Sequence, residues 1–512
     1  MITRHKYLRP MLLLLLLLAA VLSFSGCSSS DASPSLWVVT EESNDDGMTR
    51  LVRQVVNAFQ ADHPDVAVTL DVLPTGGSQR ETVVKQLRTK IMAGNGPDVF
   101  LLPSCDAYRY NLTTWYPSEI LTLSNRIEPL FSDPLQTMYR GAFMDISRFY
   151  DSDTDLRTEQ LQPDVMEAGT LDGGRYLLPL YYDFPVLYAD TEGMQSMGLE
   201  LDGRWGNLVE AALAQGNALL ASNAKPDFCQ LGSAFTLLPD TLNYENDTVA
   251  LTEADFFSFL TRYQALLTLA DGQDSDPYGP SMDNWANHSW IQITEPDGSF
   301  HTDDTEMFPN KIPVLVSTLS QAPIAAAIAK AARREEVQMI PLTGDDGALT
   351  ATVIYYGALG AGCRNPALGY DLLRRFLLEE NQWELTRPTY PDPLDRPYPQ
   401  QYHPIVNGWP VRNHGWLNSQ WLYYRNTQRM FIGGSNRNAA GNRRLRLLRV
   451  DLTEDDIPIL DVKIDRVSFG NTLEQEIATL LRQLRDGEAG DADLEAQATQ
   501  FLRELRWQIT EG

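Results

Sequence analysis

The sequence predicts an α/β fold, and residues 36–106 supply the observations that predict it. Residues 36–40 are a short apolar run of strand length, and apolar residues then recur every three or four positions from Met48 to Phe59, as in a helix with one buried face. Residues 66–72 alternate apolar with smaller or polar residues, which is typical of a strand covered on one side. Strands that alternate with helices predict a doubly wound parallel sheet, because parallel neighbours need a crossover of about a dozen residues.

The ends of these elements carry signals of their own. Pro64 ends the first helix, and Ser78 followed by Glu81 forms a capping box that begins the second helix. Residues 98–102 then form an apolar run that indicates a strand buried on both faces. Ligands of such sheets bind beyond the carboxyl ends of the strands. The polar side chains expected at those ends, as candidates for ligand binding, are Glu41, Glu42, Asn44 and Asp106.

Two interpretations of the loop after the first strand remain open from the sequence. It lacks the glycine-rich pattern of a phosphate site, which favours a hydroxyl-rich ligand. Glu41, Glu42 and Asn44 are equally well explained as a solvated cluster at a helix start, where the helix dipole favours acidic side chains.

Length, charge and cysteine content narrow the class of protein. A chain of 512 residues is long for one hydrophobic core, so more than one domain is expected. The formal net charge of −27 argues against a nucleic-acid partner, since no surplus of basic residues is available to neutralise phosphates. Cys105, Cys229 and Cys363 are odd in number and widely spaced, so they predict neither a disulfide framework nor a metal site.

The N-terminus predicts export and lipid anchoring. A basic start is followed by an apolar run over residues 11–22 that is short for a membrane span, and residues 23–27 resemble the lipobox of bacterial lipoproteins, with Phe24 in place of the commoner Leu. We therefore expect a signal peptide over residues 1–26, acylation of Cys27, and a serine-rich tether over residues 27–35. This places the protein on the outer face of the cytoplasmic membrane. The alternative is an ordinary cleaved signal in which Cys27 is incidental.

The rest of the chain continues the alternation of strands and helices. Strands are predicted at residues 176–180, 184–189, 311–317, 337–342 and 349–356, and helices at residues 205–221, 253–270, 323–334, 366–380, 472–485 and 492–510. Residues 271–310 and 387–441 are loop-like and rich in tryptophan and tyrosine.

Four short segments, in this order and after a lipobox, resemble a family 1 extracellular solute-binding protein, the carbohydrate-binding component of bacterial ABC importers. They are IMAGNGPDV at residues 91–99, LPLYYD at residues 178–183, IPL followed by a glycine-rich turn at residues 340–347, and GWPV at residues 408–411. The family is related in fold to the maltose-binding protein, so the resemblance implies a two-lobed periplasmic-binding-protein-like fold. Each lobe would be a doubly wound sheet flanked by helices, and a multi-crossing hinge would join the lobes.

The resemblance also implies a division of the chain. Lobe one would hold residues 36–181 and 357–408, and lobe two residues 184–351 and 412–512. The crossings would lie near residues 181–183, 352–357 and 409–412, with a sugar bound in the cleft between the lobes. No cofactor or metal is implied, and the expected partners are a carbohydrate and the transmembrane subunits of a permease, with the binding protein itself a monomer.

Sugars present apolar ring faces with a fringe of hydroxyls, so their sites combine aromatic side chains with carboxylates and amides. Carried over from the family, the remaining candidates for ligand binding are Tyr181, Tyr182 and Asp183 at the first crossing, Ser317 at the end of a strand in lobe two, and Tyr355, Tyr356 and Trp409. For any one of these aromatic residues, packing in the core is the commoner role.

The function predicted from the sequence is capture of a sugar or oligosaccharide without catalysis. The alternative is a lipid-anchored glycosidase that uses paired carboxylates. The chain has neither a Gly-x-Ser-x-Gly nor a His-Glu-x-x-His motif. Asp151, Asp153 and Asp155 resemble the start of a calcium loop, but Leu156 replaces the required glycine, so a solvated acidic loop is expected.

Overall fold

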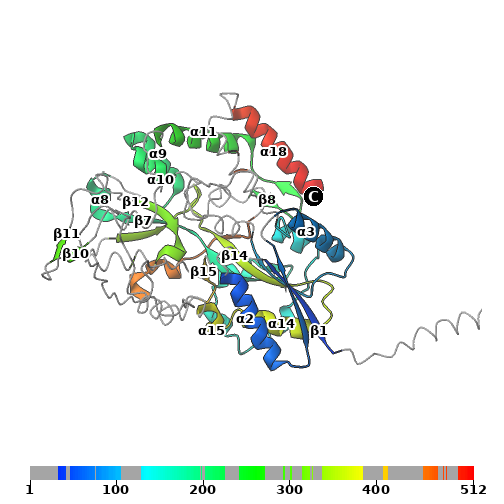
Figure 1. Cartoon of the computed structure of the whole chain (residues 1–512). Coiled ribbons are helices and arrows are strands. Elements are labelled where there is room, and N and C mark those ends of the chain that lie inside the picture. Colours follow the sequence, from blue (N-terminus) through cyan, green and yellow to red (C-terminus); the bar gives the residue numbers. More distant parts are fainter. Residues whose placement is uncertain are drawn as a thin grey trace, which may run out of the picture.

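The structure of the chain is a computed structural model (Figure 1). It describes residues 33–41, 47–74, 77–104, 129–196, 198, 202–224, 241–270, 292–294, 300–302, 314–322, 326, 337–383, 408–412, 454–470, 477, 480 and 494–511. The predicted signal peptide, Cys27, Glu42, Asn44 and Asp106 lie outside these residues. None of the described helices is both long enough and apolar enough to cross a membrane.

The larger of two mixed α/β units is built on a seven-stranded sheet, in the order β15-β6-β14-β3-β1-β2 with β16 beside β14. Its strands are β1 (Ser35–Glu41), β2 (Ala67–Leu73), β3 (Val99–Pro103), β6 (Leu177–Asp183), β14 (Thr350–Leu359), β15 (Trp409–Pro410) and β16 (Arg466–Ser468). β1 is parallel to β2 and β3, and β14 is antiparallel to β3 and β6. We call this sheet and the helices packed on it the large-sheet unit.

The opening βαβαβ arrangement predicted from periodicity is present. α2 (Gly47–Asp62) and α3 (Gly77–Met92) are the crossovers between β1, β2 and β3. The apolar stripe of α2 is buried over its whole length, from Met48 to Phe59, and all five residues of β3 are buried. β2 is the edge strand, so its side chains are mostly exposed or half-buried.

Asp98 fixes the turn into β3. Its carboxylate accepts hydrogen bonds from the backbone N–H of Trp37 at 2.8 Å and of Arg364 at 3.1 Å. The carboxylate is buried, so these bonds join β1, β3 and the chain after β14 at one point.

The smaller unit is built on a three-stranded sheet of β12 (Val314–Thr318), β7 (Pro185–Asp190) and β13 (Val337–Pro341). α9 (Trp205–Gln215), α10 (Ala218–Ala224), α11 (Glu253–Ala270) and α18 (Leu494–Glu511) pack on one another, and α10 also packs on β12. β7 is antiparallel to both neighbours, so the described part of this sheet is not doubly wound. We call this sheet and its helices the small-sheet unit. In Figure 1 its helices gather at the top, while α2 and α14 (Pro366–Arg375) lie below.

The chain passes between the two sheets at two described places. Phe184 alone links β6 to β7, next to the expected first crossing, and residues 342–349 link β13 to β14. The second crossing therefore precedes residues 352–357, which lie inside β14 because their backbone pairs with β6 and β3. β16, from the C-terminal part assigned to lobe two, pairs with β14 in the large sheet.

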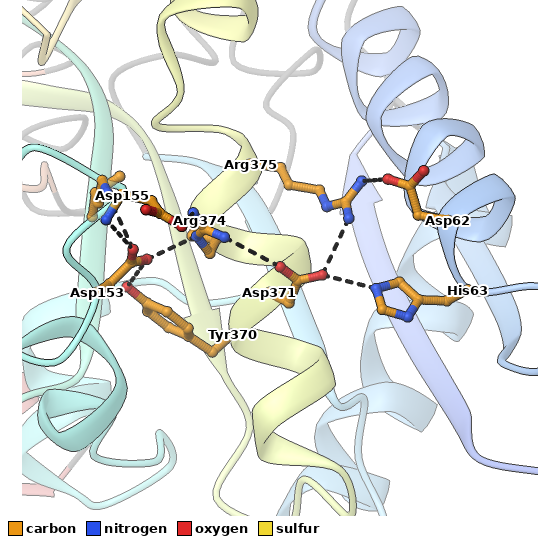
Figure 2. A network of polar contacts seen from close by, with 9 residues as sticks. Asp62, His63, Asp153, Asp155, Tyr370, Asp371, Arg374 and Arg375 are labelled. Carbon is orange, nitrogen blue, oxygen red and sulfur yellow. Dashed lines mark hydrogen bonds and ion pairs between the residues drawn. The ribbon is translucent and has the colours of Figure 1, made fainter.

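A network of charged side chains ties α14 to its neighbours in the large-sheet unit (Figure 2). Asp371 contacts His63 at 3.0 Å and Arg375 at 3.2 Å, and Arg375 reaches Asp62 at the end of α2 at 2.7 Å. On the other side Arg374 contacts Asp153 at 2.7 Å. Asp153 is thus not the solvated residue predicted from the sequence, because it is held by an arginine from a distant helix.

Candidate functional site

The carboxyl ends of four strands of the large sheet meet at one edge. β1, β2 and β3 are parallel, and β6 runs with them because β14 is antiparallel to both β3 and β6. Glu41, Ser104 and Asp183 lie at or just beyond these ends. The chain leaves the same edge for the small sheet through Phe184. This edge is the place where open α/β sheets bind ligands, and it is the candidate site.

Glu41 is buried at this edge and paired. Its carboxylate lies 2.7 Å from the guanidinium of Arg80 in α3, and the side chains are 2% and 3% exposed. Arg80 also donates to the carbonyl oxygen of Pro74 at 2.7 Å. The ion pair therefore fixes the end of β1 to the first turns of α3. The Glu41 carboxylate, which was predicted to bind a ligand, instead makes an ion pair within the protein in this arrangement.

Asp183 joins the two units at the first crossing. One carboxylate oxygen accepts from the N–H of Phe184 at 3.0 Å and from the N–H of Ser320 at 3.1 Å, and Ser320 follows β12 in the small-sheet unit. Burial raises the pKa of Asp183 to about 6, against the lowering effect of the hydrogen bonds it accepts. The side chain expected to bind a sugar thus bridges the two units.

The aromatic residues predicted as stacking surfaces are buried in the large-sheet unit. The exposed fraction is 3% or less for each of Tyr181, Tyr182, Tyr355, Tyr356 and Trp409. Tyr181 and Tyr355 meet edge to face with ring centroids 6.3 Å apart, and Trp409 lies opposite Tyr182 in the β15–β6 pair. No ring face is open to a sugar in this arrangement, so these rings pack the core beside the crossing.

The GWPV segment is explained by a close approach of strands. Gly408 has a φ of +111°, and a Cβ there would lie 3.1 Å from the side chain of Ile354 and 3.4 Å from that of Tyr181. A side chain would be strained at this φ and crowded by β14 and β6.

Sequence reasoning missed a set of buried hydroxyls at the same edge. Within the described part of the chain, Tyr181 Oη, Thr350 Oγ1 and Thr352 Oγ1 are shielded from solvent and have no hydrogen-bond partner. Thr350 and Thr352 lie on one face of β14, and Asp183 lies directly opposite Thr352, so these three share a face. Tyr181 pairs with Tyr355, where the register of the β14–β6 pair shifts. An unpaired buried hydroxyl costs about 1–3 kcal/mol. The signal in the sequence was the alternation of Thr350, Ala351 and Thr352 in an otherwise apolar strand.

Of the predicted ligand-binding residues not yet discussed, the structure describes only Ser317. Ser317 lies in β12 opposite Val186 of β7. Among the residues that the structure describes, no cluster of three or more His, Cys, Asp or Glu side chains could hold a metal ion.

Comparison with known proteins agrees with the resemblance found in the sequence. Residues 45–222 match the family model of the bacterial extracellular solute-binding proteins, which confirms the resemblance over that part of the chain. A search of curated proteins gives no match.

Several solved structures align with most of this chain at low sequence identity. A family 1 extracellular solute-binding protein from Alicyclobacillus acidocaldarius is 13% identical, with 94% of this chain and 100% of that chain covered and a TM-score of 0.46. The GacH receptor of Streptomyces glaucescens, solved with acarbose, is 13% identical over 92% and 98%, with a TM-score of 0.44. The galacto-N-biose and lacto-N-biose I-binding protein of an ABC transporter of Bifidobacterium longum is 13% identical over 94% and 99%, with a TM-score of 0.45. At this level of likeness no residue role is carried over from them.

Proposed function

We propose, from the match of residues 45–222 to the bacterial extracellular solute-binding proteins, that this chain is the substrate-binding lipoprotein of an ABC importer. It would capture a sugar or oligosaccharide between the large-sheet and small-sheet units and deliver it to the permease. It would be a monomer held at the outer face of the cytoplasmic membrane through acylated Cys27, and it would carry out no catalysis.

The observation that carries this proposal is the coincidence of two features at one edge. The carboxyl ends of the parallel strands, where ligands of α/β sheets bind, lie where the chain crosses to the second sheet. A ligand bound there would touch both units, so its binding would bias their arrangement.

Buried hydroxyls and polar loops at this edge suit a hydroxylated ligand. Thr350, Thr352 and the Tyr181 hydroxyl have no partner among the described residues. When the units separate, such groups would pair with the hydroxyls of a sugar. Glu42, Asn44, Asp106 and Ser317 are retained as ligand-binding candidates, whereas Tyr182, Tyr355, Tyr356 and Trp409 are assigned to packing.

A thermal-shift panel of mono- and oligosaccharides tests the proposal. A sugar at 100 times its dissociation constant stabilises the folded protein by about 2.7 kcal/mol, which is readily detected. A panel without any shift would contradict sugar binding, and release of cleaved product from any sugar would support the glycosidase instead.

Thr352→Val tests the assignment of the site once a stabilising sugar is known. Valine fills nearly the same volume and removes a hydroxyl without a partner, so the unliganded protein should keep or gain stability while affinity falls. Thr261→Val is the matched control, because the Thr261 hydroxyl donates to the Phe257 carbonyl oxygen on the exposed face of α11. Equal affinity in all three proteins would remove Thr352 from the site.

Anchoring has a separate test. Cys27→Ser should move the protein from the membrane fraction to the soluble fraction of expressing bacteria and abolish incorporation of labelled fatty acid. Wild type and variant that are both found in the soluble fraction would favour an ordinary cleaved signal.

A further inference from the structure

A short hairpin extends from the small-sheet unit toward the large-sheet unit. It consists of β8 (Leu242–Asn243) and β9 (Thr248–Val249), and β9 packs on α18, which packs on α11. In Figure 1 β8 lies between α18 and α3. Tyr244 is the first residue of the hairpin turn, so its position is set by the small-sheet unit.

The residue that Tyr244 reaches belongs to the large-sheet unit. Asp133 is the N-cap of α5 (Pro134–Tyr139), and its carboxylate accepts from the N–H of Gln136 at 2.9 Å. The segment before it is held by Arg88 of α3, which donates to the carbonyl oxygens of Leu130 at 2.9 Å and Pro129 at 2.8 Å. The ring of Phe131 also packs edge to face on Phe100 of β3, with centroids 5.2 Å apart.

The contact between the units has a polar and an aromatic part. The Tyr244 hydroxyl donates to the second carboxylate oxygen of Asp133, and the Tyr244 ring lies 6.0 Å from the ring of Tyr139. Asp133 is only 8% exposed. Both of its carboxylate oxygens are therefore used, one by its own helix and one by the other unit.

We propose that the Tyr244–Asp133 hydrogen bond is a clasp that holds the small-sheet unit against the large-sheet unit and must break before the two units separate. The chain crossings at Phe184 and at residues 342–349 join the units covalently, and the clasp adds a contact remote from them in sequence. Under the proposed function, on which this consequence alone rests, the clasp would have to break before a ligand reaches the buried hydroxyls at the crossing.

The clasp can be tested without a ligand, by distances between spin labels on the two units. Met92 at the end of α3 is 89% exposed and Trp507 in α18 is 64% exposed, so cysteines at these positions can be labelled without disturbing the core. The test uses the full chain with its 4 native cysteines replaced by alanine, after thermal melting has shown that this background is folded. Tyr244→Phe then removes the hydroxyl and keeps the ring.

Tyr244→Phe should raise the ratio of separated to clasped molecules roughly tenfold, which corresponds to about 1.4 kcal/mol. Tyr139→Phe is the matched control, because that ring lies at the same contact and its residue is 40% exposed, and it should leave the distances unchanged. If Tyr244→Phe fails to fold, Asp133→Asn replaces it, since asparagine still caps α5 and a neutral hydrogen bond is weaker than a charged one.

Unchanged distances in a folded Tyr244→Phe protein would overturn the clasp, as would an equal change in Tyr139→Phe. Neither result depends on any sugar. A failure of the sugar panel would therefore count against the proposed function and leave the clasp standing.

Discussion

The buried pair of Glu41 and Arg80 gives a sharp prediction, because the sequence and the structure assign Glu41 different tasks. As a ligand-binding residue, Glu41 would be dispensable for folding. As the partner of Arg80, with 2.7 Å between their charged groups and both side chains at least 97% buried, it is part of the frame that positions the loop after β1. The perturbation is Arg80→Met, which keeps the aliphatic volume and removes the charge.

We expect Arg80→Met to lower the free energy of unfolding of the large-sheet unit by about 3–5 kcal/mol, the usual cost of leaving one member of a buried ion pair alone. The Pro74 carbonyl oxygen also loses the donor that now lies 2.7 Å away. The assay is urea unfolding at pH 7, followed by tryptophan fluorescence, to which Trp37 in β1 of this unit contributes.

Two further variants make the measurement decisive. Glu41→Met combined with Arg80→Met should recover most of the loss, since a buried pair replaced by apolar residues is often neutral or stabilising. Arg364→Met is the control: this arginine contacts Asp98 at 3.4 Å but its side chain is 68% exposed, so its removal should cost less than about 1 kcal/mol. A cost for Arg80→Met no larger than that for Arg364→Met would refute the reasoning.

Two other predictions concern residues at the crossing. Trp409→Ala should destabilise the unliganded protein by about 3–5 kcal/mol in urea unfolding, because it removes a side chain that is only 2% exposed; an unchanged midpoint would return Trp409 to the candidates for ligand binding. Asp183→Asn should change the pH dependence of the melting temperature. The pKa of Asp183 is raised from 3.8 to about 6 by burial, so its contribution to stability is fully present below pH 3.8 and is lost as the pH rises through 6. Asparagine does not titrate, so the melting temperature of the variant relative to that of the wild type should rise between pH 4 and pH 7.5. A difference in melting temperature that stays constant over this range would contradict the prediction.

Hydrophobic periodicity along the sequence was enough to predict the helices and strands whose burial depends on neighbouring residues. The stripe of α2 and the five buried residues of β3 follow from periodicities of a few residues. The position of β14 between β3 and β6 was not predictable in this way. It pairs Tyr355 with Pro103 and Thr352 with Asp183, contacts between residues far apart in sequence.

The site was harder to predict because one residue type serves two purposes. A tyrosine beside a crossing suits a sugar or a core equally well, and only the packing of β6, β14 and β15 decides for Tyr181, Tyr182 and Trp409. Arg80 did carry a signal. A basic side chain near the start of α3 opposes the helix dipole, which indicates a nearby acidic partner, and Glu41 is that partner.

Two of the hydrogen bonds between the described parts of the units share an electrostatic property. At the crossing the Ser320 N–H of the small-sheet unit donates to Asp183, and at the hairpin the Tyr244 hydroxyl donates to Asp133. Both acceptors are buried carboxylates of the large-sheet unit, and burial raises the pKa of each to about 6 although hydrogen bonds, and for Asp133 the nearby Arg140, act in the opposite direction.

If the units separate and expose a buried carboxylate, the pKa of that carboxylate falls back toward 3.8. Separation is therefore accompanied by proton release. The arrangement seen in the structure should be most favoured below about pH 4 and should weaken as the pH rises through 6. Spin-label distances between positions 92 and 507, measured from pH 4.5 to pH 7.5, should show the separated population growing with pH. The growth should be smaller in Asp133→Asn, whose amide does not titrate. A separated population that is independent of pH, or that falls as the pH rises, would show that the carboxylates stay buried when the units move.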